Sequence, residues 1–251
     1  MLLVIDIGNT RTKWALADSE GNLSPMELCL NADIGHAKFP ISQVTKVVVS
    51  NVAGEQLANT ITQLLQPLVV HFVGATAQAC GVKNQYAAGL GTDRWAALVA
   101  AWHNTKHATV AVNAGTAITI DALAPSNNKS AINQAAEFLG GTIMPGLNTM
   151  RASLSANAAL LNVEEGVWQE FPTNTSDAIQ AGCLNAIIGA INLMLKRLEK
   201  QCGRPPLLLL SGGDADKIAQ ALGMQILNLA TKQVIITENL VLQGLVLLAK
   251  A

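Results

Sequence analysis

The sequence predicts an α/β protein built from two related lobes with a cleft between them, and two observations lead to this prediction. The first is a near-repeat: MLLVIDIGNT at the start of the chain returns about a hundred residues later as TVAVNAGTAITID. The second is that each copy is followed by an alternation of strand-like and helix-like segments. An internal duplication of this period indicates two lobes, which we place at residues 1–107 and 108–251.

The first lobe opens with an apolar run, Leu2–Ile7, that is typical of a strand buried on both faces. Gly8 and Asn9 follow it, and this pair is typical of a turn after which the chain returns antiparallel. Pro67 ends a helix-like stretch, because proline cannot continue a helix. We expect strands over 2–7, 12–17, 46–50 and 68–73, helices over 55–66 and 92–107, and a long loop over 74–91.

The second lobe repeats the hairpin and continues with glycine-rich and apolar segments. Leu207–Leu210, which follows two prolines, is typical of a buried strand. A last helix is expected within Asn239–Ala249 and is a candidate to pack back on the first lobe. We further expect strands over 110–113 and 117–123, an exposed turn over 125–133, a glycine-rich segment over 138–146, and helices from there to 160, over 176–200 and after the turn 211–214.

The composition indicates a large core and few charges. Charged residues make up 13% of the 251 residues, well below the usual quarter, and half of the chain is apolar. We therefore expect an oligomer that hides part of its surface, with a large core alone as the alternative. The net charge of −1 and the lack of Lys/Arg clusters argue against nucleic acid as a partner.

The sequence also predicts a cytoplasmic protein with no membrane partner. Asp6 interrupts the first apolar run and no basic region precedes it, so we expect no signal peptide. The apolar run 239–249 is too short to span a bilayer and is typical of a buried helix. The cysteines show no metal-ligand spacing, so we expect buried thiols in a reducing compartment at positions 29, 80, 183 and 202.

The two hairpin turns carry the predicted chemistry. In Asp6–Thr10 and in Asn113–Thr116, a glycine lets a phosphate approach the main chain, where amides and a threonine hydroxyl donate hydrogen bonds. Two such loops facing each other would hold the phosphates of a nucleotide from both sides. For one copy alone, the alternative is a tight turn that uses these residues for shape. Arg11 and Lys13 share one face of the returning strand, and each either reaches a phosphate or is a solvated charge.

A second candidate site lies where the glycine-rich segment before Thr92 enters a helix. There Asp93 stands beside Arg94. Asp93 is a candidate to accept a proton from an attacking hydroxyl, and Arg94 to hold a carboxylate through a bidentate pair. The alternative is a helix cap with a surface ion pair.

With these residues, the sequence resembles the type III pantothenate kinases, members of the superfamily of acetate kinase, sugar kinases, Hsp70 and actin. The resemblance is specific, because the sugar kinases of the superfamily share the first loop but not the GTDR segment. It implies an actin-like, ribonuclease H-like fold for both lobes, with a nucleotide cleft between them. The matching segments are DIGNTRTKW at 6–14, YAAGLGTDRWAAL at 86–98, AGTAITID at 114–121, EFLGGTIMPGL at 137–147, TSDAIQAG at 175–182 and SGGDA at 211–215.

The resemblance implies an enzyme that transfers a phosphoryl group from ATP to an alcohol. Its substrate would be pantothenate, its product 4′-phosphopantothenate, and its place the first step of coenzyme A biosynthesis. ATP and Mg²⁺ would be required, with Asp6 near the metal. The implied ATP contacts are Asp6, Ile7, Gly8, Asn9, Thr10, Arg11, Thr12, Lys13, Gly115 and Thr116.

The same resemblance implies roles around pantothenate. Asp93 would be the general base for the pantothenate hydroxyl. Thr175 would reach the substrate of a neighbouring subunit, which implies a homodimer with the active site at its interface. The remaining implied pantothenate contacts are Tyr86, Gly91, Thr92 and Arg94.

One position departs from the family pattern. The family commonly carries aspartate where this chain has Asn113, and that aspartate helps to bind a monovalent cation, K⁺ or NH₄⁺. Asparagine keeps a carbonyl oxygen but loses the charge, so we expect weaker or absent dependence on potassium.

Two other functions remain open at this point. One is another kinase of the superfamily, or a phosphatase of the exopolyphosphate type, although no sugar-binding cluster of acids and amides is evident. The other is a non-catalytic regulatory protein that binds nucleotide, since members of the family have been described as transcription accessory factors. The presence of Asp6, Asp93 and Arg94 argues against the regulatory function.

Overall fold

A computed structural model of the chain describes residues 1–86, 88–126, 135–157, 165–224 and 233–251. The contacts of the chain divide it into two compact units. The first unit consists of Met1–Lys106, Ser126–Phe138 and Asn239–Ala251, and the second of His107–Pro125 and Leu139–Glu238. The chain therefore leaves the first unit after residue 106 and returns to it twice. The expected exposed turn over 125–133 falls almost entirely outside the described residues.

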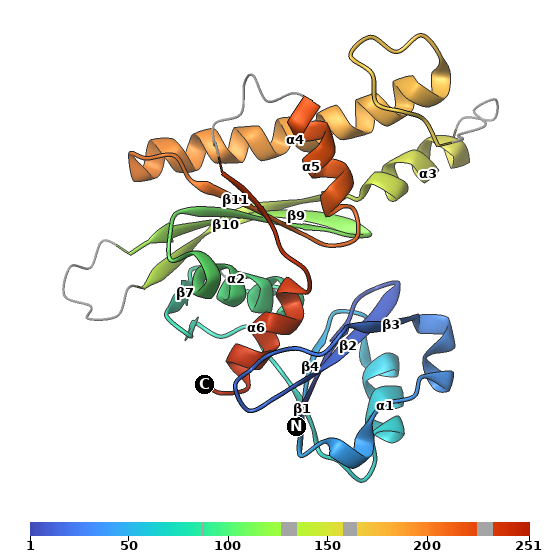
Figure 1. Cartoon of the computed structure of the whole chain (residues 1–251), viewed down its shortest axis with the longest axis vertical. Coiled ribbons are helices and arrows are strands. Elements are labelled where there is room, and N and C mark those ends of the chain that lie inside the picture. The colour runs from blue at the N-terminus through green and yellow to red at the C-terminus, as the bar shows by residue number, and fades with distance from the viewer. Residues whose placement is uncertain (87, 127–134, 158–164, 225–232) are drawn as a thin grey trace. The chain divides into compact units, whose positions relative to one another are not determined.

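The first unit is built on a five-stranded sheet with the order β3-β2-β1-β4-β5 (Figure 1). β1 pairs antiparallel with β2, which confirms the hairpin predicted around Gly8. On its other side β1 is parallel to β4, and β4 is parallel to β5. The strands are β1 Leu2–Ile7, β2 Arg11–Ala17, β3 Glu27–Leu30, β4 Lys46–Asn51 and β5 Val70–Phe72.

The second sheet repeats this arrangement. Its order is β12-β11-β8-β9-β10-β7-β6, so five of its strands follow the same plan as the first sheet. β8 pairs antiparallel with β9 and parallel with β11, which confirms the second hairpin. These strands are β8 Thr109–Ala114, β9 Ala117–Pro125, β10 Ala136–Pro145, β11 Leu207–Ser211 and β12 Val234–Ile236.

The duplication extends to the residues beside the two turns. Asp6 of β1 is paired with Ser50 of β4, and Asn113 of β8 is paired with Ser211 of β11. In both copies, the residue before the turn therefore has a serine beside it on the neighbouring parallel strand. This residue is an acid in the first copy and an amide in the second. This match was not evident from the sequence, because the serines follow the turns by different numbers of residues.

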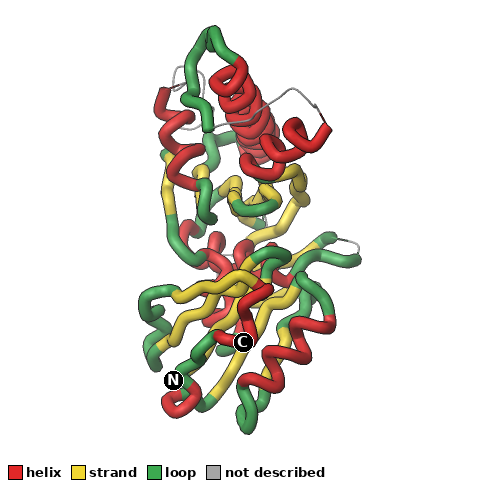
Figure 2. The backbone as a smooth tube through the Cα atoms, turned by 90° about the vertical axis from the view of Figure 1, so that its right-hand side faces the viewer, coloured by secondary structure: helices red, strands yellow, loops and turns green. Residues whose placement is uncertain are grey.

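Helices cover the sheets in each unit (Figure 2). One core cluster forms around β1, β2 and β4 and includes the buried side chains of Trp14 and Ile61. Another forms where α4 packs on β8 and β9, and it includes Ile187 and Ile191 of α4. The α-helices are α1 Glu55–Leu64, α2 Thr92–Thr105, α3 Leu147–Asn157, α4 Thr175–Cys202, α5 Ala215–Met224 and α6 Leu240–Leu248.

Two predictions need correction. The segment 74–91 is not one long loop, because it contains the short antiparallel pair β6 (Gln78–Ala79) and β7 (Val82–Asn84). β7 in turn pairs with the start of β10. The expected burial of all four cysteines is also wrong: they are free thiols, but only Cys183 is buried, and the other three are half-buried.

The helix α4 is long and apolar enough to cross a membrane, by length and composition alone, among the residues that the structure describes. Half of its most apolar stretch is buried inside the protein. Its buried positions, such as Leu184, Ile187, Ile191 and Leu195, recur at spacings of three and four. This pattern is typical of a helix that packs one face on a protein core.

The last helix, α6, belongs to the first unit, where it packs on α2 and β1. Gly244 permits this packing, because a Cβ atom there would overlap the carbonyl group of Ala96 in α2. We expect Gly244→Ala to lower the free energy of unfolding by about 3 kcal/mol, since a side chain forced into a packed core must push the helices apart. Urea unfolding followed by circular dichroism measures this loss.

Gly189 of α4 provides a matched control, because a Cβ atom there would meet nothing within 4 Å. Gly189→Ala is therefore expected to raise the free energy of unfolding by about 0.5–1 kcal/mol through helix propensity. If both substitutions shifted stability by the same amount, close packing of α6 on α2 would be the wrong explanation.

Candidate active site

The first predicted phosphate loop connects β1 to β2. Four residues lie between the paired residues Ile7 and Thr12, and the Gly8 N–H donates to the Arg11 carbonyl at 3.1 Å. Asn9, Thr10 and Arg11 are exposed, whereas Ile7 and Thr12 are fully buried. The loop therefore presents its tip to solvent while its base is anchored in the core.

Asp6 stands at the end of β1 between Lys13 on β2 and Ser50 on β4. Paired residues of adjacent strands share a face of the sheet, so Lys13, rather than Arg11, is beside the carboxyl group. Burial, together with the charge of Asp93, raises the pKa of Asp6 to about 7, even though Lys13 and a hydrogen bond with Ser50 act to lower it. The Asp6 Oδ1 atom is buried and has no hydrogen-bond partner.

The Asp6 carboxyl group fits a Mg²⁺ ion. A buried carboxylate oxygen without a donor is costly unless a cation or a proton neutralises it. Mg²⁺ is held in many phosphate-binding proteins by one or two carboxylates and by the phosphates themselves. No cluster of three or more His, Cys, Asp or Glu side chains that could hold a metal ion occurs in the described part of the chain.

Asn31 makes three hydrogen bonds with the first loop and its base. It was not among the predicted site residues. Its backbone N–H donates to the Thr10 carbonyl at 3.0 Å, and its side-chain Nδ2 donates to the Gly8 carbonyl at 2.7 Å. Its Oδ1 accepts the Thr12 hydroxyl at 2.9 Å. No local sequence pattern marks Asn31, since the groups it contacts lie about twenty residues earlier in the chain.

The glycine-rich segment before α2 places Asp93 close to Asp6. Ser50 is hydrogen-bonded with the Thr92 hydroxyl at 2.9 Å, which joins the start of α2 to β4. Burial raises the pKa of the Asp93 carboxyl group, while the Arg94 N–H, at 2.7 Å from Oδ1, and the Arg94 charge lower it. A Cβ atom at Gly91 would come within 2.6 Å of the same oxygen, so glycine leaves room for the carboxylate.

Arg94 is not a surface residue. It is only 5% exposed, and its guanidinium carbon lies 5.4 Å from the centre of the Tyr86 ring and 5.8 Å from that of Phe138. These two rings are stacked with centres 5.9 Å apart. The alternative of a surface ion pair is therefore wrong for Arg94.

Phe138 was not among the predicted site residues. It is fully buried in β10, where it is paired with Asn84 of β7. Its position explains how the Tyr86 segment is held beside Arg94. A single apolar residue in a glycine-rich stretch gives no signal of this role.

The second predicted phosphate loop is shorter by one residue. Three residues separate the paired Ala114 and Ile118, and the Gly115 N–H donates to the Ala117 carbonyl at 3.1 Å. Gly115 and Thr116 are exposed, and Asn113 is half-buried. This loop therefore shares the exposed glycine–threonine tip of the first loop.

Two distant glycines pack against the second loop. The Gly146 N–H and the Thr149 hydroxyl both donate to the Thr116 carbonyl at 2.8 Å. A Cβ atom at Gly146 would overlap the Gly115 carbonyl, and one at Gly212 would overlap Ala114. Gly212 also has a φ of +98°, a conformation that favours glycine. The glycine-rich segments at 138–146 and 211–214 thus support this loop.

Thr175 is exposed at the first residue of α4. Its neighbour Asn174 accepts the Asp177 N–H at 2.9 Å. The buried Asp177 carboxylate in turn accepts from the Val167 N–H at 2.7 Å, the Gln169 amide at 3.0 Å and the Asn174 amide at 2.7 Å. These bonds fix the backbone on both sides of Thr175.

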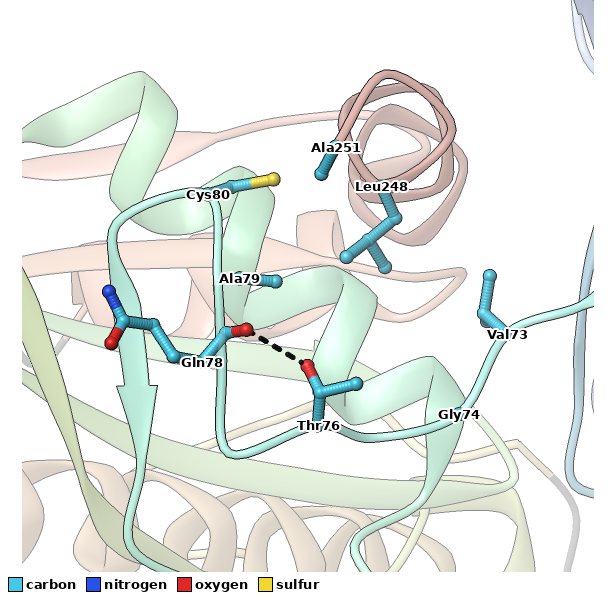
Figure 3. Close-up of a pocket in the computed structure, with 8 residues that line it drawn as sticks. All are labelled: Val73, Gly74, Thr76, Gln78, Ala79, Cys80, Leu248 and Ala251. Atoms are coloured by element: carbon cyan, nitrogen blue, oxygen red, sulfur yellow. Dashed lines mark hydrogen bonds between the residues drawn. The ribbon is translucent and has the colours of Figure 1, made fainter.

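A pocket of about 570 Å³ in the first unit is separate from the predicted site (Figure 3). Its polar lining includes Thr76, whose hydroxyl donates to the Gln78 carbonyl at 3.2 Å. None of the predicted ATP or pantothenate contacts lines it. The residues that line it are Val73, Gly74, Thr76, Gln78, Ala79, Cys80, Leu248 and Ala251.

The two repeated sheets and their glycine–threonine loops define the class of protein: an actin-like, sugar-kinase-like α/β fold. The chain is similar over 96% of its length to a Baf family protein from Campylobacter jejuni, named as a transcriptional activator, with 94% of that chain covered, a TM-score of 0.60 and 23% identity. It is also similar over 98% of its length to a protein from Sinorhizobium meliloti described as a 2-dehydro-3-deoxygalactonokinase, with 97% of that chain covered, a TM-score of 0.56 and 10% identity. At these identities the likeness concerns the fold alone.

The sequence comparisons identify the family. The family model of the type III pantothenate kinases matches residues 2–197. The chain is 43% identical to a type III pantothenate kinase from Methylobacillus flagellatus over 97% of this chain and 96% of that one. It is 37% identical to a type III pantothenate kinase from Laribacter hongkongensis over 100% of this chain and 99% of that one. The chain therefore belongs to the type III pantothenate kinase family.

Proposed function

We propose that the chain catalyses ATP-dependent phosphorylation of pantothenate to 4′-phosphopantothenate, the first step of coenzyme A biosynthesis. Its membership of the family is the observation that carries this function. The geometry of the first unit agrees with it, since the exposed phosphate loop, the unpartnered Asp6 oxygen and the Asp93 carboxyl group belong to one cluster. Each is a group that phosphoryl transfer to an alcohol requires.

In the proposed reaction, the loops at 6–13 and 113–116 bind phosphate through backbone N–H groups and threonine hydroxyls. When bound, Mg²⁺ would neutralise charge on the phosphates, and Asp6 would hold it. Asp93 orients the primary hydroxyl of pantothenate and accepts its proton as the oxygen attacks the γ-phosphorus. Its raised pKa supports this role, because a base works best when its pKa approaches the working pH.

We propose that Tyr86, Gly91, Thr92 and Arg94 bind pantothenate. Arg94 supplies a fixed guanidinium for the substrate carboxylate, because its stem is buried and its plane lies near two aromatic rings. Thr175 is proposed to reach the substrate of a second subunit in a homodimer, for which its exposure at the start of α4 is suitable. The free thiols and the low charge support a cytoplasmic homodimer.

A coupled assay of ADP release tests the function. The protein with Mg-ATP is offered pantothenate, glucose, acetate or no acceptor in separate reactions. We expect ADP release that depends on pantothenate and is absent with the other acceptors. Release with glucose or acetate instead would support another kinase of the superfamily. Nucleotide binding without turnover on any acceptor would support the regulatory alternative.

Asn113 leads to a separate prediction about monovalent cations. It occupies the position of Asp6 in the second repeat, beside Ser211, but carries no charge. We expect turnover to change less than about twofold when K⁺ replaces Na⁺, since a neutral amide binds a cation more weakly than a carboxylate. Asn113→Asp is expected to introduce a dependence on K⁺. Steep, saturable activation of the unmodified protein by micromolar to low-millimolar K⁺, but not by Na⁺, would contradict the prediction.

A further inference from the structure

We propose that Asn31 is a positioning residue for the first phosphate loop: it holds the Gly8 and Thr10 carbonyls on the side of the loop away from the nucleotide phosphates. This inference rests on the proposed function, because it assigns to the loop at 6–13 the binding of phosphate. Asn31 itself contacts no reacting group. Its effect on the reaction passes through the backbone of the loop.

The position of Asn31 follows from the strand pairing. β3 pairs antiparallel with β2, with Arg11 opposite Leu30. The next residue, Asn31, therefore lies opposite Thr10 and directly behind the loop. Its backbone N–H continues the ladder by donating to the Thr10 carbonyl at 3.0 Å. The side chain then reaches further along the loop to Gly8, where Nδ2 donates at 2.7 Å.

These two bonds set the orientation of two peptide groups. In a planar trans peptide the C=O and the following N–H point in opposite directions. Because the Gly8 and Thr10 carbonyls point to Asn31, the N–H groups of Asn9 and Arg11 point away from it. Asn9, Thr10 and Arg11 are also the exposed residues of the loop. The side of the loop away from Asn31 therefore carries N–H donors, which an anion requires, while these two carbonyl dipoles are directed to Asn31.

An asparagine is specifically suited to this place. Its amide nitrogen donates to the Gly8 carbonyl while its oxygen accepts the Thr12 hydroxyl at 2.9 Å. Thr12 is fully buried, so the accepting oxygen also satisfies a hydroxyl that water does not reach. Aspartate would keep this acceptor, but it would set an oxygen against the Gly8 carbonyl. Alanine would lose both side-chain bonds and keep only the backbone bond.

The test is calorimetric binding of Mg-ADP and of adenosine to the full chain, with Asn31→Ala and Asn31→Asp as variants. We expect both variants to weaken Mg-ADP binding by about 10–100-fold, because the loop's donors lose their fixed orientation. The affinity for adenosine is expected to change by less than about threefold. Adenosine has no phosphate, and the loop's N–H donors interact with phosphate alone. In steady-state kinetics the KM for ATP is expected to rise while the KM for pantothenate stays unchanged.

Asn22 provides a matched control. It is an exposed asparagine whose side chain donates to Asp18 at 3.0 Å in the turn after β2. Asn22→Ala removes hydrogen bonds of an asparagine without touching the phosphate loop, so Mg-ADP binding is expected to stay unchanged. Thermal unfolding without ligand shows that each variant is folded at the temperature of the titration.

The outcomes separate this inference from the proposed function. If the unmodified protein binds Mg-ADP and the folded Asn31 variants bind it equally well, Asn31 does not position the loop. The same conclusion follows if adenosine and Mg-ADP weaken to the same extent. If the unmodified protein binds no Mg-ADP, the proposed function itself fails.

Discussion

Replacement of Asp93 by asparagine is expected to lower kcat by about 10²–10⁴-fold, the usual effect of removing a general base. The carboxyl group is partly buried next to the Arg94 N–H, and asparagine has nearly the same shape. The substitution therefore removes the proton acceptor with little change in packing. Mg-ATP binding is expected to stay close to that of the unmodified protein, because Asp93 lies in α2 and not in the phosphate loop between β1 and β2. Steady-state kinetics and calorimetry measure the two quantities.

Asp216 offers a control for this substitution. It is the second residue of α5, as Asp93 is the second residue of α2, and it is exposed. Asp216→Asn is expected to leave kcat unchanged. Full turnover in Asp93→Asn would show that another group accepts the proton.

Replacement of Asp6 by asparagine is expected to have opposite effects on stability and activity. Turnover is expected to fall by about 10²-fold or more, because a carboxylate that holds Mg²⁺ against the phosphates is lost. Without metal and nucleotide, the same variant is expected to be more stable than the unmodified protein at pH 8. The second repeat supports this expectation, since it already carries an amide, Asn113, at the corresponding position.

The stability effect depends on pH in a definite direction. Burial raises the pKa of Asp6 from 3.8 to about 7 in the folded protein, so the folded state holds this proton more tightly than the unfolded chain does. The group therefore costs no stability below about pH 4, and its cost grows until the pH passes about 7. A shift of this size corresponds to about 4 kcal/mol at most. Urea unfolding at pH 5 and pH 8 measures the cost.

Asp18 provides a control, because its pKa is shifted in the opposite direction to that of Asp6. Hydrogen bonds from Asn22, Gly21 and Glu20 lower the pKa of its carboxyl group. Asp18→Asn is therefore expected to give no gain in stability at pH 8. The measured quantity is the gain in free energy of unfolding of Asp6→Asn over the unmodified protein. If this gain were no larger at pH 8 than at pH 5, the Asp6 carboxyl group would not be an uncompensated buried charge.

The hairpins and most helices could be predicted from the sequence, because their signals are local. The apolar run Leu2–Ile7 followed by glycine is sufficient for a strand and a turn, and the same pattern at 109–116 predicts the second copy. The short strands β6 and β7 could not be predicted in this way. With two and three residues they are too short for an alternating pattern, and they depend on pairing with each other and with β10.

The parts of the site that sequence reasoning missed act over long separations in the chain. Asn31 supports a loop that precedes it by about twenty residues, and Phe138 lies beside Arg94, more than forty residues earlier. Each depends on strand pairing, which places residues together without any local signal. Arg94 is predicted as a site residue because it follows Asp93 in the chain, whereas Gly91 is predicted from the family resemblance. The alternative of a surface ion pair for Arg94 is wrong because this side chain is buried. Its burial could not be predicted, since charged residues are rarely buried.

The most direct test of the proposed reaction is to identify its product. The protein is incubated with Mg-ATP and pantothenate, and the mixture is analysed by mass spectrometry and phosphorus NMR. We predict that pantothenate gains one phosphoryl group on its primary hydroxyl, at a rate that Asp93→Asn lowers strongly. If the folded protein bound ATP but left pantothenate unmodified, the chain would not be a pantothenate kinase.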